Sequence, residues 1–188
     1  MTMSYERNNA KYMFPHEFKT YAGRKPVSAM AKGWGLDLDR GDRSQQDDRF
    51  RQRYRSAFTD KTLHKDSDVS HIIASNKGGI NATENVFMFD KRLNRAIGDS
   101  QLGMALNSAL VGKKRACDAA RLSRKHGSYE GKTGSQNYSQ GVRVLKTKGV
   151  MVRKGGGIDR RSAAVRSGDL VLNKDGSIRS NAAFKIWS

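Results

Sequence analysis

The chain has one cysteine and two prolines among its 188 residues, and it contains no long apolar run. A single cysteine, Cys117, excludes an internal disulfide and a Cys-x-x-Cys zinc site, so we expect no structural zinc. No apolar stretch approaches the roughly 18 residues that a membrane-spanning helix needs, and the N-terminus lacks the apolar core of a signal peptide. These absences predict an intracellular, cytoplasmic protein that has no membrane partner.

Acidic residues are also scarce. The chain carries 18 Asp and Glu against 36 Lys and Arg, which gives a net charge of +18 and a pI near 10.3. Such a chain repels itself unless counterions or a polyanion neutralise it, so nucleic acid is the default partner. A basic protein of ribosomal or chromatin type fits the same composition.

The charge is unevenly distributed. Residues 1–66 carry 14 basic and 9 acidic groups, 100–142 carry 7 and 2, and 143–188 carry 11 and 3. Residues 67–99, in contrast, carry 4 of each. A neutral segment between basic flanks suits a site that holds a cation beside surfaces that bind phosphates.

A chain of this length can bury one ordinary core. We expect a basic helical region at 1–66 and a compact core with a following helix at 67–126. The Gly- and Ser-rich stretch at 127–142 is typical of a linker or exposed loop. A basic extension follows at 143–188. The sequence predicts alternating runs from the end of the linker, beginning with VRVL at 142–145, and a short helix over 159–167, DRRSAAVRS.

The neutral segment predicts a hairpin followed by a helix. Residues 67–73, SDVSHII, alternate and end in β-branched residues, which is typical of a strand. SNKGG reads as a loop, NVFMF as a second strand, and DKRLNRAIGD as a helix opened by Asp90. A longer helix is expected from about Ser100 to Lys125, with an interruption near Gly112.

Hydrolysis of a phosphodiester requires a base, a divalent cation and a rigid frame for both. His71, at the end of the first strand, is the candidate base, and Asn94 is the polar helix residue placed to face it. A packed histidine followed by glycines and asparagines in turns would have the same pattern without any chemistry.

The segment resembles the HNH endonucleases, also called ββα-metal or His-Me finger nucleases. Members show a metal-binding acid or His, the catalytic His, two aliphatics, a Gly-Gly loop, a middle Asn and a final His or Asn on the helix. The intervals of 14 residues from His71 to Asn85 and 9 more to Asn94 follow this pattern. The resemblance covers about 32 of the 188 residues, and the matching positions are His71, Ile72, Ile73, Gly78, Gly79, Asn81, Asn85 and Asn94.

The resemblance implies an α+β fold: a small ββα-metal nuclease core embedded in helices, with a basic C-terminal α/β extension. It further implies that His71 activates water, that Asn94 coordinates Mg²⁺ or Mn²⁺, and that Asn85 serves catalysis by bracing the loop and orienting His71. Ser70 stands where the family usually supplies an acidic or His metal ligand, and a hydroxyl is a weaker, neutral ligand. Asp68, two residues back on the same strand face, is a candidate substitute.

Affinity for DNA is expected from basic residues on and after the helix of this unit. Contacts to phosphates give affinity and a steep salt dependence but little sequence discrimination, and any one of these charges can equally be solvated. The predicted contacts are Arg92, Arg95, Lys113, Lys114, Arg115, Arg121, Arg124 and Lys125.

The resemblance thus predicts a metal-dependent endonuclease acting on double-stranded DNA. Phage or intron homing enzymes are the nearest subtype, which would place it in the host cell cytoplasm if a phage encodes it; a restriction-type or packaging-associated nuclease is the alternative. A homodimer is possible, because cutting both strands needs two sites or sequential action. The competing class is a noncatalytic basic nucleic-acid-binding protein with a degenerate HNH fold. A secreted nuclease toxin is disfavoured because no export segment is visible.

Overall fold

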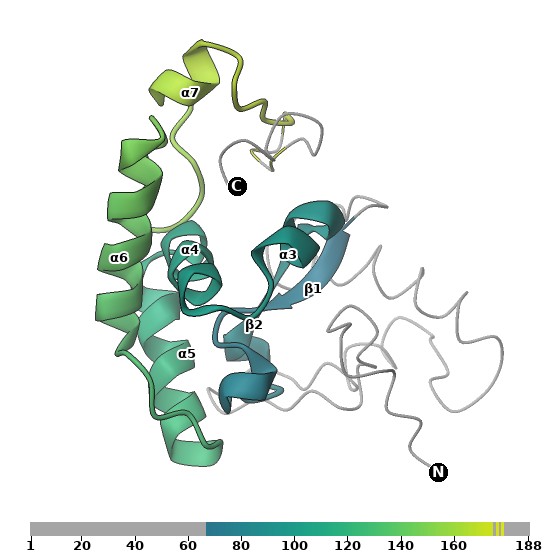
Figure 1. Cartoon of the computed structure of the whole chain (residues 1–188), viewed down its shortest axis with the longest axis vertical. Helices are drawn as coiled ribbons and strands as arrows, with labels where there is room; N and C mark the ends of the chain where they lie inside the picture. Colours follow the sequence, from purple (N-terminus) through teal and green to yellow (C-terminus); the bar gives the residue numbers. More distant parts are fainter. Residues whose placement is uncertain (1–66, 175, 177, 179–188) are drawn as a thin grey trace, which may run out of the picture.

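A computed structural model of the chain describes residues 67–174, 176 and 178. The predictions for 1–66 and for the end of the extension, 179–188, lie outside these residues. Within them, the chain is mainly helical and carries one two-stranded antiparallel sheet (Figure 1), which agrees with the expected α+β class. None of the helices in this part of the chain combines the length and apolar character needed to cross a bilayer.

The sheet is a hairpin with a long connection. Strand β1 (Ser67–His71) pairs with β2 (Val86–Asp90), and His71 lies opposite Val86. Two short 3-10 helices, η3 (Ser75–Lys77) and η4 (Thr83–Asn85), shape the connection, and helix α3 (Lys91–Ile97) follows β2 directly. The elements therefore follow one another in the order that the sequence predicts.

Strand β1 is shorter than predicted. Ile72 and Ile73, expected to extend the strand, lie beyond its last paired residue and are fully buried. They anchor the start of the connection in the core, which fixes the position of His71 just before them.

Two helices follow the hairpin unit. Helix α4 (Gln101–Val111) begins at Ser100, whose hydroxyl accepts a hydrogen bond from the amide of Gly103 at 3.0 Å. Helix α5 (Lys113–His126) starts after Gly112, which has a φ of 94°. That left-handed φ suits glycine and ends the helical path, so the predicted interruption is confirmed.

The prediction of a linker or exposed loop over 127–142 is wrong from Gly134 onward. Helix α6 (Gly134–Thr147) occupies this stretch and packs on α4 and α5. A capping box starts it, in which the Thr133 hydroxyl accepts from the Gln136 amide and the Gln136 side chain accepts from the Thr133 amide. The glycines that suggested a linker instead allow close packing: a Cβ on Gly141 would lie 2.0 Å from the carbonyl oxygen of Ala105.

One hydrophobic core joins the hairpin to the helices. Helix α4 lies between α6 on one side and the hairpin with α3 on the other (Figure 1). The core includes Ile72 and Leu93 from the hairpin unit, Leu106 from α4 and Leu145 from α6, all at most 2% exposed. The hairpin unit is therefore packed on the helices, because η4 contacts α5 and the apolar residues of the hairpin and of α4 share one core.

The C-terminal stretch is less regular than predicted. The run 142–145, expected to alternate, belongs to α6, and the helix expected over 159–167 is only one turn, α7 (Ala163–Arg166). Isolated antiparallel bridges join Val152 to Ile158 and Leu172 to Ile178. The extension thus has helical and extended parts but no further strand pairing than these bridges among its described residues.

Candidate functional site

His71 is held at the end of β1 by two side chains from elsewhere in the chain. Its Nε2 lies 2.9 Å from Oδ1 of Asn81, which belongs to the connection between the strands. Its backbone carbonyl accepts a hydrogen bond of 2.9 Å from Nδ2 of Asn107 on α4. The imidazole is buried, with 7% of the residue exposed. Both the ring and the main chain of His71 therefore have a defined position.

The contact with Asn107 follows from the geometry of the hairpin. The amide of Ile72 donates to the carbonyl of Asn85, so this amide points to the side of β1 on which β2 lies. The carbonyl of His71 therefore points to the opposite edge of β1, which pairs with no strand among the described residues. A buried carbonyl at such an edge needs a donor. Asn107 supplies it.

The protonation of His71 is set by its surroundings. Burial lowers the pKa of His71 below its ordinary value, because the charged imidazolium loses water, and the hydrogen bond to Asn81 only partly opposes this effect. The ring is therefore neutral at neutral pH. When Oδ1 of Asn81 accepts a hydrogen bond from Nε2–H, the lone pair of the neutral ring lies on Nδ1, which becomes the proton-accepting atom.

Asn85 braces the connection from inside. Its residue is fully buried, and its Oδ1 accepts from the amide of Ile73 at 2.8 Å. Its Nδ2 donates to the carbonyls of Ile73 and Ile80, both at 2.9 Å. These three bonds tie the start of the connection to its later part, as the bracing role predicts.

The glycine pair makes this closed loop possible. Gly78 has a φ of 88°, and a Cβ on Gly79 would lie 1.9 Å from the carbonyl oxygen of Ile73. Only glycine fits such a conformation and such an approach. The segment around His71 is therefore rigid because of the same glycines and asparagine that form the predicted motif.

Asn107 was not identified in the sequence. It is 4% exposed, and its Oδ1, like the hydroxyl of the neighbouring Ser108, has no hydrogen-bond partner among the described residues. A buried polar atom without a partner is costly and rare. The available signal was an asparagine among the apolar residues of the helix at 102–111, but its partner, 36 positions away, could not be deduced.

The predicted metal ligands are neutral oxygen donors. Ser70 is 1% exposed and precedes His71 on β1, while Asn94 is half-buried on α3, three residues before the buried Ile97. Across the described residues, no group of three His, Cys, Asp or Glu is placed to hold an ion. The side chain of Asp68 lies outside the described part of the structure. Hydroxyl and amide oxygens are ligands of the kind that a hard cation such as Mg²⁺ takes beside water and phosphate oxygens.

The predicted DNA contacts differ in their surroundings. Arg95 is exposed on α3, whereas the side chain of Arg92 lies outside the described part. Lys113 is exposed at the start of α5, and Lys114 pairs with Asp118 at 2.8 Å. Arg115 departs from the prediction: it is half-buried and donates from Nη2 to the carbonyl of Val86 at 2.7 Å, which ties α5 to β2.

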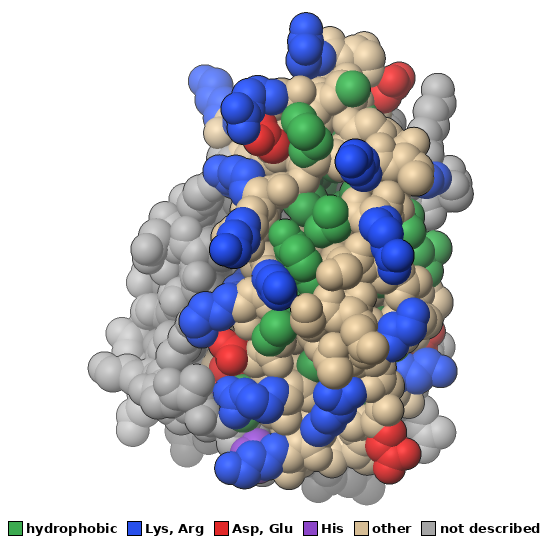
Figure 2. Space-filling view, turned by 90° about the vertical axis from the view of Figure 1, so that its left-hand side faces the viewer, with side chains coloured by type: hydrophobic (Ala, Val, Ile, Leu, Met, Phe, Trp, Pro, Cys, Tyr) green, Lys and Arg blue, Asp and Glu red, His purple; other side chains and the backbone are tan. Residues whose placement is uncertain are grey.

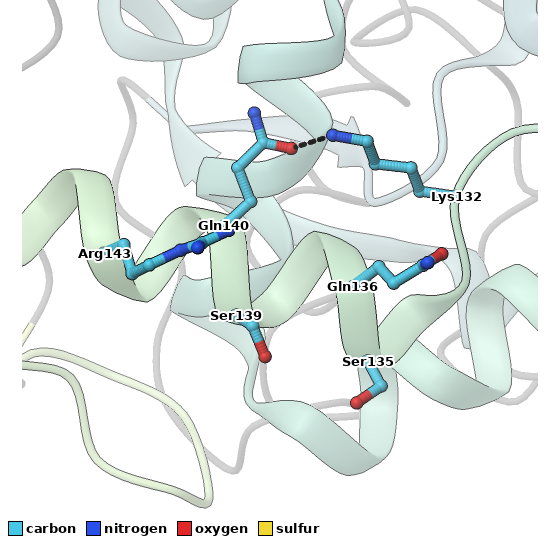
Figure 3. A pocket seen from close by; sticks show the side chains of 6 residues that line it. All are labelled: Lys132, Ser135, Gln136, Ser139, Gln140 and Arg143. Atoms are coloured by element: carbon cyan, nitrogen blue, oxygen red, sulfur yellow. Dashed lines mark hydrogen bonds between the residues drawn. The ribbon is translucent and has the colours of Figure 1, made fainter.

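The other predicted contacts, Arg121, Arg124 and Lys125, are exposed on the last turns of α5. They line a hollow of about 490 Å³. A second hollow, of about 310 Å³, is lined by residues of α6 and by Lys132 before it (Figure 3). Neither hollow is lined by His71, Asn85 or Asn94, so the basic surface and the buried histidine are separate features.

Comparisons of the chain with models of protein families, with curated proteins and with solved structures found no match.

Proposed function

We propose that the protein is a metal-dependent DNA endonuclease of the HNH type that hydrolyses phosphodiester bonds. The observation that carries the proposal is the setting of His71: a buried, neutral imidazole, held by Asn81 through Nε2, in a connection braced by Asn85. A general base needs this combination of an available lone pair and a fixed orientation.

In the proposed reaction, Nδ1 of His71 takes a proton from a water molecule while the oxygen of that water forms a bond to phosphorus. The bond from phosphorus to the 3′ oxygen breaks, and the departing oxygen takes a proton from solvent. Asn81 holds the ring so that Nδ1 points at the water, and Asn85 keeps the connection from shifting. His71 is the catalytic residue in this scheme, and the two asparagines position it.

We propose that Asn94 and Ser70 hold the metal, Mg²⁺ or Mn²⁺, through their oxygen atoms. When bound, the ion supplies neutralisation of the charge on the phosphate. Because both side chains are uncharged, affinity for the ion depends on the phosphate as well as on the protein. Metal binding without DNA should therefore be weak.

The proposed substrate is double-stranded DNA, and the proposed site of action is inside a cell, as for phage or homing enzymes of this type. The basic charge supports a polyanionic partner, because residues 100–174 contain 16 Lys and Arg and only 4 Asp and Glu. A monomer would cut one strand per encounter. A homodimer would allow cleavage of both.

A noncatalytic nucleic-acid-binding protein is the second candidate function. The buried, neutral Ser70 at the position of the usual acidic ligand favours it, since the loss of that ligand would weaken the metal site. In this case the contacts of His71 and its partners would serve only to maintain the structure of the connection between β1 and β2.

Incubation of supercoiled plasmid with the protein and Mg²⁺ or Mn²⁺, with and without EDTA, tests the proposal. We expect nicked or linear product only without EDTA, with phosphate on the 5′ ends. Plasmid that is retarded in a gel but remains intact with either ion would favour the second candidate.

A further inference from the structure

The stretch that the sequence presents as a linker forms one side of a basic groove. The two hollows described above lie next to each other, because Ser135 lines both of them. One wall is the end of α5 and the other is the first half of α6. We call this surface the α5–α6 groove and define it by its cationic residues, Arg121, Arg124, Lys125, Lys132 and Arg143.

The two hollows are lined by positive charge and hydrogen-bond donors, and one of the cations, Arg121, also pairs with Asp118 at 3.5 Å. No Asp or Glu lines either hollow. Between the cations lie hydroxyl and amide side chains, among them Ser135, Ser139 and Gln136, which Figure 3 shows projecting from α6. Arg and Lys together with Ser, Thr and Gln are the side chains that contact the phosphates and sugars of DNA.

The cations of the groove are held in place. The Lys132 ammonium donates to Oε1 of Gln140 at 2.8 Å (Figure 3). The guanidinium of Arg124 donates to the carbonyl of Gly131 and lies 5.5 Å from the ring centre of Tyr129. Positive groups that are ordered before binding lose less entropy when a ligand arrives.

The loop between the two walls is also fixed. The Tyr129 hydroxyl donates to the carbonyl of Lys132 at 2.6 Å and accepts from Nδ2 of Asn137 at 3.2 Å. At the start of α6, a Cβ on Gly134 would lie 2.2 Å from the carbonyl oxygen of Ala116 on α5. The two walls are therefore in close contact, and the shape of the groove does not depend on a ligand.

The α6 wall of the groove lies away from the candidate site, whereas α5 also packs on η4. Helix α6 is on the far side of α4 from the hairpin and α3 (Figure 1), and Lys and Arg side chains are spread over the face that it forms, where Asp and Glu are few (Figure 2). His71 lines neither hollow, so the contacts made within the groove do not include it. Contacts in the groove would therefore contribute to the affinity for DNA and not to the rate of the chemical step.

From these observations, we propose that the α5–α6 groove binds the phosphate backbone of double-stranded DNA outside the phosphate that is cleaved. This inference shares its DNA partner with the proposed nuclease function. It rests on that function only in distinguishing the phosphates of the groove from the phosphate that is cleaved. DNA binding in EDTA tests the groove, whereas cleavage by the unmodified protein tests the nuclease, so the two can fail separately.

The test uses the full chain with Arg121→Gln, Lys132→Gln and Arg143→Gln combined. All three residues are exposed, so the variant should fold, which circular dichroism and thermal unfolding verify. Affinity for a short DNA duplex is measured in EDTA over a range of KCl concentrations. We expect binding to weaken by about tenfold or more, and the slope of log K against log salt to fall by about 2 to 3, at roughly 0.9 for each lost phosphate contact.

A matched variant, Lys154→Gln, Arg166→Gln and Lys174→Gln, removes the same charge from three exposed positions that line neither hollow. We expect its slope to fall by less than half as much as that of the groove variant. Equal losses in both variants would mean that net charge alone attracts DNA and would overturn the proposal. Unchanged binding of the groove variant would overturn it as well.

Discussion

The chemistry of the proposed site depends on which nitrogen of His71 carries the proton. Asn81 contacts Nε2, and burial keeps the pKa of the ring below its ordinary value. A base acts in its deprotonated form, so cleavage should be constant at neutral pH. The rate should fall only when the pH drops through the lowered pKa.

Replacing Asn81 by aspartate should move this fall to higher pH. A carboxylate that accepts a hydrogen bond from Nε2–H stabilises the imidazolium and raises the pKa of His71, by about one unit or more. Asn81→Ala removes the hydrogen bond that partly offsets the effect of burial on the pKa of His71. The fall in rate should therefore move to lower pH. Single-turnover cleavage rates between about pH 5 and 8 measure both shifts, and a shift of the same sign in both variants would contradict the assignment.

Asn107 should matter through its bond to the carbonyl of His71. Asn107→Ala leaves this buried carbonyl without a donor and should lower the free energy of unfolding by about 1 to 3 kcal/mol. Ser108→Ala is the matched control, because it removes an equally buried hydroxyl that has no partner among the described residues. Its stability should be unchanged or slightly higher in urea denaturation. Equal losses in the two variants would show that the Asn107 bond has no special weight.

At the level of elements, the packing of α6 on α4 depends on Gly141. An alanine there gains helix propensity, about 1 kcal/mol, but its Cβ would lie 2.0 Å from the Ala105 carbonyl oxygen. The helices must separate, so Gly141→Ala should lower the free energy of unfolding by about 1 to 3 kcal/mol. Gly155→Ala, which would meet no atom within 4 Å, should be close to neutral. Thermal or urea unfolding of both variants provides the comparison, and equal stability would contradict the close contact.

The elements also show how far the sequence could predict this fold. Alternation and turn residues between 67 and 97 indicated a hairpin and a helix, because this unit is built from local contacts. The same glycine signal failed at α6, since Gly134 and Gly141 serve contacts with α5 and α4 that the local sequence does not contain. Thr133 and Gln136, a Thr-x-x-Gln capping pair, were the local signal for a helix start that outweighs the glycines.

The site divides in the same way. The spacing of His71, Asn85 and Asn94 could be read from the sequence, and the bonds of Asn85 follow from its place in the loop. The contact of Asn107 with His71 spans 36 positions and joins two elements, so only the packing of α4 against β1 reveals it. The bond of Arg115 to β2 is likewise a tertiary contact, which composition could not separate from a surface charge.

For the whole molecule, charge alone does not define the DNA-binding surface. Some arginines of the extension hold the chain together: Arg160 donates to the carbonyls of Asn173 and Lys174, and Arg161 pairs with Asp159 at 2.7 Å. The pKa of Asp159 is lowered to about 2, mainly by the hydrogen bonds from the side chain and the amide of Arg161. Net charge therefore overstates the number of cations that are available to bind phosphates.

The central claim is that His71 acts as the base in DNA hydrolysis, and the most direct test is single-turnover cleavage of plasmid by His71→Ala. With Mg²⁺ or Mn²⁺ and excess protein, we expect the variant to cut at least about 10²-fold more slowly than the unmodified chain. Both proteins should bind the plasmid equally well in EDTA, since the base acts only in the transition state. Cleavage by His71→Ala at the unmodified rate would contradict the account.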